Sequence, residues 1–187
     1  MAAFAKFTAG FSASFKEWRA AARANPLFLK GLIGAGVVAA LDQASKFWIV
    51  EIVNLPQKRQ IELSGVFNLT YVENRGASFG MLAGGLGSRI ALSAISISIA
   101  TAVIIWLARL NRAWAAAGAA LIIGGALGNL YDRVAYGFVV DFLDFSGLWF
   151  PWVFNIADAA INVGVACLII DALTHKDQPE SKSGAGD

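Results

Sequence analysis

Four long apolar stretches dominate the pattern of hydrophobic and polar positions along the chain, at residues 31–53, 90–108, 113–131 and 153–172. Each is close to the ~20 residues that an α-helix needs to cross the hydrocarbon core of a bilayer. The second stretch contains no charged residue, whereas the other three carry isolated polar residues. The pattern therefore predicts an all-α polytopic membrane protein with four transmembrane helices.

The two longer segments between these stretches differ in character. Residues 60–63 and 66–73 are rich in strand-forming residues and are separated by a Ser-Gly pair. This pattern predicts a short antiparallel hairpin or small β-sheet that lies on the membrane surface. Residues 149–152 hold three aromatic residues and a proline, and such aromatic residues are enriched at the headgroup level. We therefore expect the second segment to lie in the membrane interface.

The positive charges predict the orientation of the chain. Outside the four stretches, nine Lys and Arg residues lie on the side of both termini and five on the opposite side. Cytoplasmic segments carry the excess of positive charge. Both termini are therefore expected in the cytoplasm, and both long inter-helix segments on the extracytoplasmic side.

The two ends of the chain stand apart from the predicted transmembrane domain at residues 31–175. In residues 1–30 aromatic residues recur at steps of three and four: Phe4, Phe7, Phe11, Phe15 and Trp18. On a helix they form one stripe, so this extension is either an amphipathic helix on the membrane surface or a loosely ordered segment. Residues 176–187 are polar and predict a disordered cytoplasmic tail.

Composition agrees with a membrane protein and excludes several kinds of site. Hydrophobic residues make up 57% of the chain and charged residues 15%, against about half and about a quarter in soluble domains. The net charge of +2 is too small to indicate a nucleic-acid partner. Cys167 and His175 are the only residues of their types, which excludes an internal disulfide, a thiolate metal cluster and a site with two imidazoles. No metal or cofactor is predicted.

Polar residues inside the apolar stretches are costly in a bilayer and by default serve function. Three sets recur at helical spacing, each on one helix face: Asp42, Ser45 and Lys46; Asn129, Asp132 and Arg133; Asn155, Asp158 and Asn162. The second and third sets lie at the outer ends of their helices, and Asp141 follows on the same side. We therefore expect five polar residues to converge near the outer membrane surface: Asp132, Arg133, Asp141, Asn155 and Asp158.

Asp141 and Asp158 lack an obvious cationic partner in the sequence, whereas Asp42 can pair with Lys46 within one helix. Two carboxyl groups held together in a low-dielectric place share one proton. One can then activate a water molecule while the other protonates the departing amine. The same spacing also fits a transporter that uses these carboxylates to bind a cation or to carry protons. Asp144 is a further candidate, although its apolar neighbours also fit an interfacial, non-catalytic position.

Four blocks of the chain, in this order, resemble the lipoprotein signal peptidases, also called type II signal peptidases. The blocks are DQASK (42–46), NRGASFG (74–80), GGALGNLYDR (124–133) running on to VVDF (139–142), and FNIADAAI (154–161). Ser78 stands where the family often has alanine. Any single block is a weak signal, but four in order on the predicted topology are specific.

The resemblance implies roles for nine polar residues. Asp141 and Asp158 match the catalytic pair of an aspartyl endopeptidase. Four residues match family positions that bind the substrate or support the catalytic pair: Asn74, Asn129, Arg133 and Asn155. Three residues match family positions that support folding and stability: Asp42, Lys46 and Asp132.

The resemblance also implies a substrate and a location. The family acts in the bacterial cytoplasmic (inner) membrane on prolipoproteins that bear a diacylglyceryl-modified cysteine, and it cleaves on the N-terminal side of that cysteine. The surface hairpin resembles the cradle of the family. Cyclic peptide antibiotics of the globomycin type inhibit family members, so inhibition is expected here too. A small transporter that uses the same carboxylates is the alternative, and a non-catalytic scaffold would leave the clustered polar residues unexplained.

Overall fold

A computed structural model of the chain describes residues 2–76 and 85–174. Within this part, four helices are long and apolar enough to cross a membrane. They are α2 (Pro26–Phe47) with its continuation η1 (Trp48–Ile52), α4 (Leu86–Leu107), α5 (Ala113–Ala135) and α6 (Ile156–Thr174). The four predicted transmembrane helices are therefore confirmed, with shifts of a few residues at their ends.

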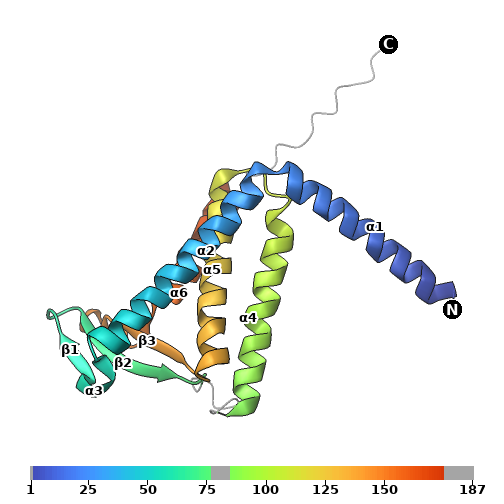
Figure 1. Ribbon diagram of the computed structural model, residues 1–187. Coiled ribbons are helices and arrows are strands. Elements are labelled where there is room, and N and C mark those ends of the chain that lie inside the picture. The colour runs from blue at the N-terminus through green and yellow to red at the C-terminus, as the bar shows by residue number, and fades with distance from the viewer. Residues whose placement is uncertain (1, 77–84, 175–187) are drawn as a thin grey trace.

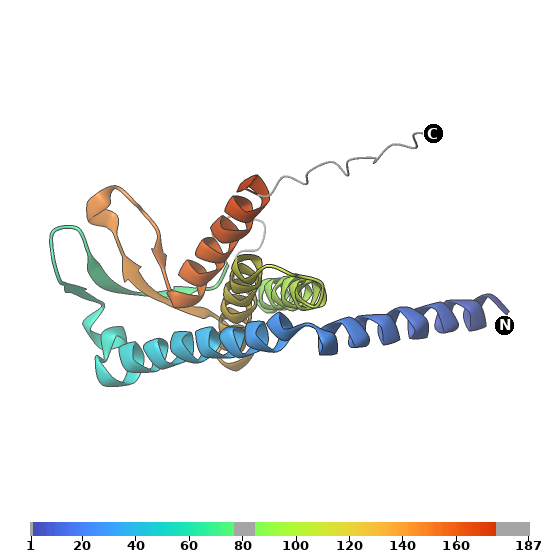
Figure 2. The same cartoon turned by 90° about the horizontal axis from the view of Figure 1, so that it is seen from above.

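Helix α5 is the centre of the bundle, and α2, α4 and α6 pack around it (Figures 1 and 2). In its apolar window 67% of the residues are buried, against 17% to 22% in the other three helices. Glycines allow this close packing. A Cβ atom at Gly125 would lie 2.4 Å from the carbonyl oxygen of Ala157, and one at Gly124 would lie 2.6 Å from that of Ala35. Helix α5 can therefore carry polar residues without exposing them to lipid.

A four-stranded antiparallel sheet lies at the end of the bundle opposite the start of α2 and the end of α6 (Figure 1). Its strands, in spatial order, are β1 (Gln60–Glu62), β2 (Asn68–Asn74), β3 (Val139–Asp144) and β4 (Val153–Phe154). The predicted hairpin is confirmed as β1 and β2. The segment between α5 and α6, which we expected only to lie in the interface, contributes β3 and β4.

An apolar cluster packs the sheet against the C-terminal end of α2. Ile49 and Leu55, which is in the short helix α3 (Leu55–Lys58), pack with Leu69 of β2 and with Val140 and Phe142 of β3. All five side chains are buried. Because Val140 and Phe142 flank position 141 in β3, this cluster fixes the strand that carries Asp141. The short helix η3 (Ser146–Leu148) connects β3 to β4.

Residues Ala2–Ala24 form helix α1, which leaves the bundle sideways from the start of α2 (Figures 1 and 2). Of the two alternatives for the N-terminal extension, the structure has a helix. Only Asn25 separates α1 from α2. The predicted tail at residues 176–187, His175 and the Ser78 departure lie outside the described residues.

Candidate active site

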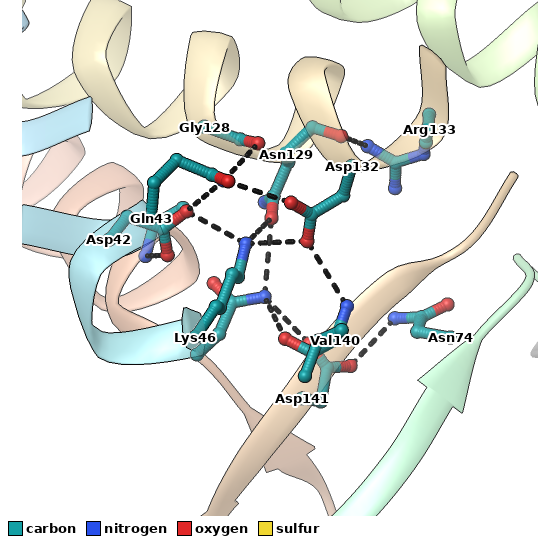
Figure 3. A network of polar contacts seen from close by, with 12 residues as sticks. Asp42, Gln43, Lys46, Asn74, Gly128, Asn129, Asp132, Arg133, Val140 and Asp141 are labelled. Carbon is teal, nitrogen blue, oxygen red and sulfur yellow. Dashed lines mark hydrogen bonds and ion pairs between the residues drawn. The ribbon is translucent and has the colours of Figure 1, made fainter. Parts of the chain in front are cut away.

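Asp141 lies in β3, one of the two inner strands of the sheet, and is 1% exposed. Each of its carboxylate oxygens has an amide donor. The side-chain amide of Asn74 in β2 donates to Oδ2 at 3.0 Å (Figure 3), and that of Asn155 donates to Oδ1 at 2.6 Å. The antiparallel register pairs Val72 with Asp141 and Asn74 with Val139, which brings the Asn74 side chain beside this carboxylate.

Asp158 lies in the first turn of α6 and is half-buried. Its carboxylate oxygen Oδ1 accepts a hydrogen bond from the side-chain amide of Asn129 in α5 at 2.7 Å. Its backbone N–H donates to the side-chain oxygen of Asn155 at 2.9 Å. Asn155 directly precedes α6, so this second bond is a helix N-cap, for which Asn is a preferred residue.

Asn155 links the two aspartates. Its side-chain amide donates to Asp141 while its side-chain oxygen accepts from the Asp158 backbone. The same amide lies 3.2 Å from the side-chain oxygen of Asn129 and 3.3 Å from the carbonyl oxygen of Val140. Because Asn155 is fully buried, its position is fixed, and it holds the strand that carries Asp141 against the helix that carries Asp158.

Lys46 of α2 lies among the polar side chains next to this pair of aspartates (Figure 3). Its ammonium nitrogen lies 2.7 Å from Asp42 and 2.8 Å from Asp132, and it donates to Asn129 at 3.3 Å. Asp42 in turn accepts from the backbone N–H of Ala157 at 2.9 Å. Asp132 accepts from the backbone N–H of Val140 at 3.1 Å. The pairing of Asp42 with Lys46 is therefore confirmed, and the ammonium group also joins α2 to α5.

Arg133 lies in the last turn of α5 and is half-buried. Its guanidinium group donates to the carbonyl oxygen of Asn129 at 3.4 Å and interacts electrostatically with Asp158 and Asp141. None of the ion pairs among the described residues includes Arg133. Its charge therefore remains available to a ligand that approaches Asp158.

Two hollows lead to Asp158. One of about 230 Å³ lies between α4, α5 and α6, and its lining includes Leu92, Ile99, Arg133 and Asp158. The other, of about 340 Å³, is lined by Phe150 and Trp152 as well as Asp158. Both are largely apolar. Asp158 is thus reached from the surface of the bundle, whereas Asp141 lies deeper.

Burial raises the pKa of the Asp141 carboxyl from 3.8 to about 7, and the nearby negative charge of Asp158 adds to the increase. The amide donors of Asn74 and Asn155 and the charge of Lys46 act in the opposite direction. At neutral pH Asp141 is therefore protonated for about half of the time. A carboxyl group in that state can serve as a general acid beside a second carboxylate.

A family model described as signal peptidase (SPase) II matches residues 34–174. This range covers most of the chain and contains all nine predicted site residues. The chain belongs to the signal peptidase II family.

Known relatives and structures agree with this membership. A lipoprotein signal peptidase of Caulobacter vibrioides is 45% identical over 144 residues, which cover 76% of this chain and 86% of the relative. One of Methylocella silvestris is 42% identical over 151 residues, covering 80% and 88%. A solved bacterial membrane enzyme superposes with a TM-score of 0.69 at 28% identity, covering 83% of this chain and 94% of that chain. The matches support a membrane peptidase and lend no support to a transporter.

The site of this signal peptidase II family member also contains a residue that sequence analysis did not single out. Gln43 donates to Asp132 at 2.8 Å and to the carbonyl oxygen of Gly128 at 3.1 Å (Figure 3). Its position inside an apolar span, next to Asp42, was the available signal. Asp144, by contrast, accepts from the Thr70 hydroxyl at 2.5 Å and from the Ser146 backbone at 2.9 Å. It therefore closes a turn of the sheet.

No group of three or more His, Cys, Asp or Glu side chains in residues 2–76 and 85–174 has an arrangement that could hold a metal ion. The chemistry that this part of the chain can supply is that of paired carboxyl groups, amide donors and one guanidinium group.

Proposed function

We propose that Asp141 and Asp158 are the catalytic pair of an intramembrane aspartyl endopeptidase. Its substrate is a prolipoprotein with a diacylglyceryl-modified cysteine, cut on the N-terminal side of that cysteine. The observation that carries this proposal is the link through Asn155, which contacts both aspartates. The relatives named lipoprotein signal peptidase support the substrate class.

The mechanism uses the two carboxyl groups in different protonation states. The ionised carboxylate of Asp158 takes a proton from a water molecule, whose oxygen attacks the scissile carbonyl carbon. The protonated carboxyl of Asp141 donates to the carbonyl oxygen, so that a tetrahedral diol forms. When the diol collapses, the carbon–nitrogen bond breaks and the amine leaves with the proton that Asp158 took from water. A diol hydroxyl returns its proton to Asp141, which restores the starting state of the pair. The pKa of Asp141, raised to about 7, supports its role as the proton donor.

The remaining polar residues position the reacting groups. Asn74 and Asn155 hold the carboxyl group of Asp141, and Asn129 holds that of Asp158. Arg133, with no carboxylate partner among the described ion pairs, binds the substrate backbone near Asp158. Asp42, Lys46 and Asp132 form the buried ionic support behind them.

The signal peptide is an apolar helix that reaches the site from within the bilayer. The hollow between α4, α5 and α6 leads from the lipid-facing surface to Asp158 and Arg133, which fits a helical substrate that enters sideways. The hollow beside Phe150 and Trp152 is apolar enough for acyl chains. Cyclic peptide antibiotics of the globomycin type are expected to inhibit the protein by occupying the same site.

The proposed location is the bacterial cytoplasmic (inner) membrane. Both termini are cytoplasmic, and the sheet and the aspartate pair lie near the extracytoplasmic face. The positive-charge bias of the sequence supports this orientation, as does the sheet at the bundle end opposite the end of α6 (Figure 1). Residues 31–175 form the peptidase domain in this proposal, residues 1–30 a cytoplasmic extension and residues 176–187 a cytoplasmic tail.

The test compares three isosteric variants in one assay. Purified protein is incubated with a diacylglyceryl-modified prolipoprotein, and conversion to the shorter form is followed on gels. Asp141→Asn and Asp158→Asn should each lower the rate by roughly 10²-fold to 10⁴-fold, the usual contribution of an acid or base. Asp144→Asn is the matched control, because it removes a buried charge from the same strand as Asp141. Near-normal cleavage by either of the first two variants would contradict the assignment.

A second measurement separates the peptidase from the transporter. Wild-type protein in liposomes should convert the prolipoprotein without carrying protons or cations across the bilayer. Ion flux that is lost in Asp141→Asn, together with no cleavage of the precursor by the wild type, would favour the transporter.

A further inference from the structure

Helix α1 is joined to the bundle by a built contact at Asn25. The side-chain oxygen of Asn25 caps α2 by accepting from the backbone N–H of Leu27 at 2.9 Å. Its amide nitrogen lies 2.7 Å from the carbonyl oxygen of Leu110, 3.1 Å from that of Ala108 and 3.3 Å from that of Leu107. These carbonyl groups end α4 and begin the turn to α5. One side chain therefore fixes the corner where three helices meet.

Trp18 makes a second contact about two helical turns before that corner. Its indole N–H donates to the carbonyl oxygen of Ile105 in α4 at 3.1 Å. Its ring packs edge-on against Phe28 of α2, with 5.9 Å between the ring centroids, and it stacks on Phe15. Trp18 thus holds the C-terminal half of α1 against the bundle, and Phe15 and Trp18 form an aromatic side of this helix. These contacts fix the direction in which α1 extends from the start of α2.

The side of α1 next to these aromatic residues carries a basic cluster. Lys16, Arg19 and Arg23 are exposed and, at steps of three and four, lie on one helix face. Arg19 is at the edge of this face, with its guanidinium carbon 5.9 Å from the centroid of the Phe15 ring. Ala20 sits between them, and its short side chain leaves a hollow of about 240 Å³ that the three basic side chains border. No ion pair of the described residues includes any of the three. Glu17 is the only acidic residue in residues 1–30.

We propose that this hollow binds the phosphate of an anionic phospholipid in the cytoplasmic leaflet, with residues 12–24 of α1 in the headgroup layer. The aromatic side of α1 and its basic side together form the pattern of an interfacial helix. Arginine pairs strongly with phosphate through two parallel hydrogen bonds, and two arginines with one lysine supply enough charge for one headgroup. The proposal rests on the proposed cytoplasmic location of the termini, because the anionic lipids of the cytoplasmic leaflet attract clusters of basic residues.

A lipid-binding measurement tests this proposal. Wild-type protein in detergent is titrated with phosphatidylglycerol, and bound lipid is counted by native mass spectrometry. Each basic residue near an anionic surface contributes about fivefold in affinity, so the double variant Arg19→Gln/Arg23→Gln should bind its first phosphatidylglycerol roughly 25-fold more weakly. Arg19→Lys/Arg23→Lys keeps the charges and should recover most of the affinity. Phosphatidylcholine should bind all proteins equally and weakly.

The matched control is Lys58→Gln/Arg59→Gln, which removes two exposed charges at the opposite end of the molecule. It should bind phosphatidylglycerol like the wild type. An equal loss in both double variants would mean general charge attraction and would overturn the proposal. Competition by inorganic phosphate at the concentration of the lipid would assign the hollow to free phosphate, and it would also overturn the proposal.

Hydrogen exchange gives an independent readout in a bilayer. Amides of residues 12–24 should exchange more slowly in nanodiscs that contain phosphatidylglycerol than in pure phosphatidylcholine. This difference should vanish in Arg19→Gln/Arg23→Gln while exchange in α5 stays unchanged, which shows that the variant is folded. Equal exchange of the wild type in both nanodiscs would contradict the proposal. The catalytic assignment does not depend on any of these outcomes.

Discussion

Asp141→Asn should abolish a decrease in the unfolding free energy that the wild-type protein shows as the pH rises. Burial raises the pKa of this carboxyl from 3.8 to about 7. The contribution of Asp141 to folding is therefore fully present below pH ~4 and is lost as the pH rises through about 7, because the buried group must then ionise. Roughly three pH units at 1.36 kcal/mol each amount to about 4 kcal/mol.

The measurement is the free energy of unfolding in detergent between pH 4.5 and pH 9, for the wild type and the variant. Asparagine cannot accept from both Asn74 and Asn155, so Asp141→Asn should lose about 1–3 kcal/mol at every pH. The informative quantity is therefore the slope with pH. Wild-type stability should fall between about pH 4 and pH 7 and level off above, while that of the variant stays nearly flat. Across this range the stability of the variant relative to the wild type should therefore rise by up to about 4 kcal/mol.

Asp144→Asn supplies the control of opposite sign. Burial acts to raise the pKa of Asp144, but hydrogen bonds from Thr70 and Ser146 outweigh it and leave the pKa below 3.8. Its stabilising contribution is fully present well above pH 3.8 and is lost only as the pH falls below 3.8. The slope through neutral pH should therefore be that of the wild type. A flat wild-type profile, or an equal slope in wild type and Asp141→Asn, would refute the reasoning.

Three further predictions concern the support of the site. Lys46→Met leaves Asp42 and Asp132 without their shared ammonium group and should lower the unfolding free energy by about 3–5 kcal/mol; no loss in chemical denaturation would contradict the ionic support. Asn155→Ala should lower kcat about 10²-fold with little change in KM, because it misplaces the aspartates; a change in KM alone would assign it to substrate binding. Gly125→Ala forces α5 away from Ala157 and should cost about 1–3 kcal/mol, read from thermal unfolding, and unchanged stability would show that the helices can adjust.

The transmembrane helices could be predicted because bilayer thickness sets one length scale for every apolar run. The strands β3 and β4 could not. Residues 139–144 form a short apolar run, and such a run does not distinguish a strand from a helix segment. Its strand identity comes from pairing with β2, far away in the sequence. Val153 and Phe154 looked like the start of the fourth helix for the same reason, yet they pair with β3.

The polar residues of the helices could be found because each is expensive at its depth in the membrane. Asn74 and Asp141 lie in the sheet, and they were indicated by the family resemblance and, for Asp141, by its position after the third predicted helix. Their partners were harder to find. The pair of Asp42 and Lys46 follows from spacing within one helix, but the contact of Lys46 with Asp132 depends on how α2 and α5 are rotated. The same holds for Asp42, which caps the first turn of α6. These contacts arise from packing across helices, which no local pattern in the sequence encodes.

The two aspartates belong to different parts of the fold, and the site is therefore assembled at a seam. Asp141 comes from the sheet and Asp158 from the membrane bundle. Among the described contacts, Val140 is held to Asp132 and Asn155 by two hydrogen bonds, of 3.1 Å and 3.3 Å. A shift of the sheet by about 1 Å would stretch the bond between Asn155 and Asp141 beyond hydrogen-bonding range. If Asp141 and Asp158 are the catalytic pair that we propose, the docking of the sheet on the bundle is itself a condition for activity. A ligand that separates the sheet from the bundle would then inhibit without contacting either carboxylate.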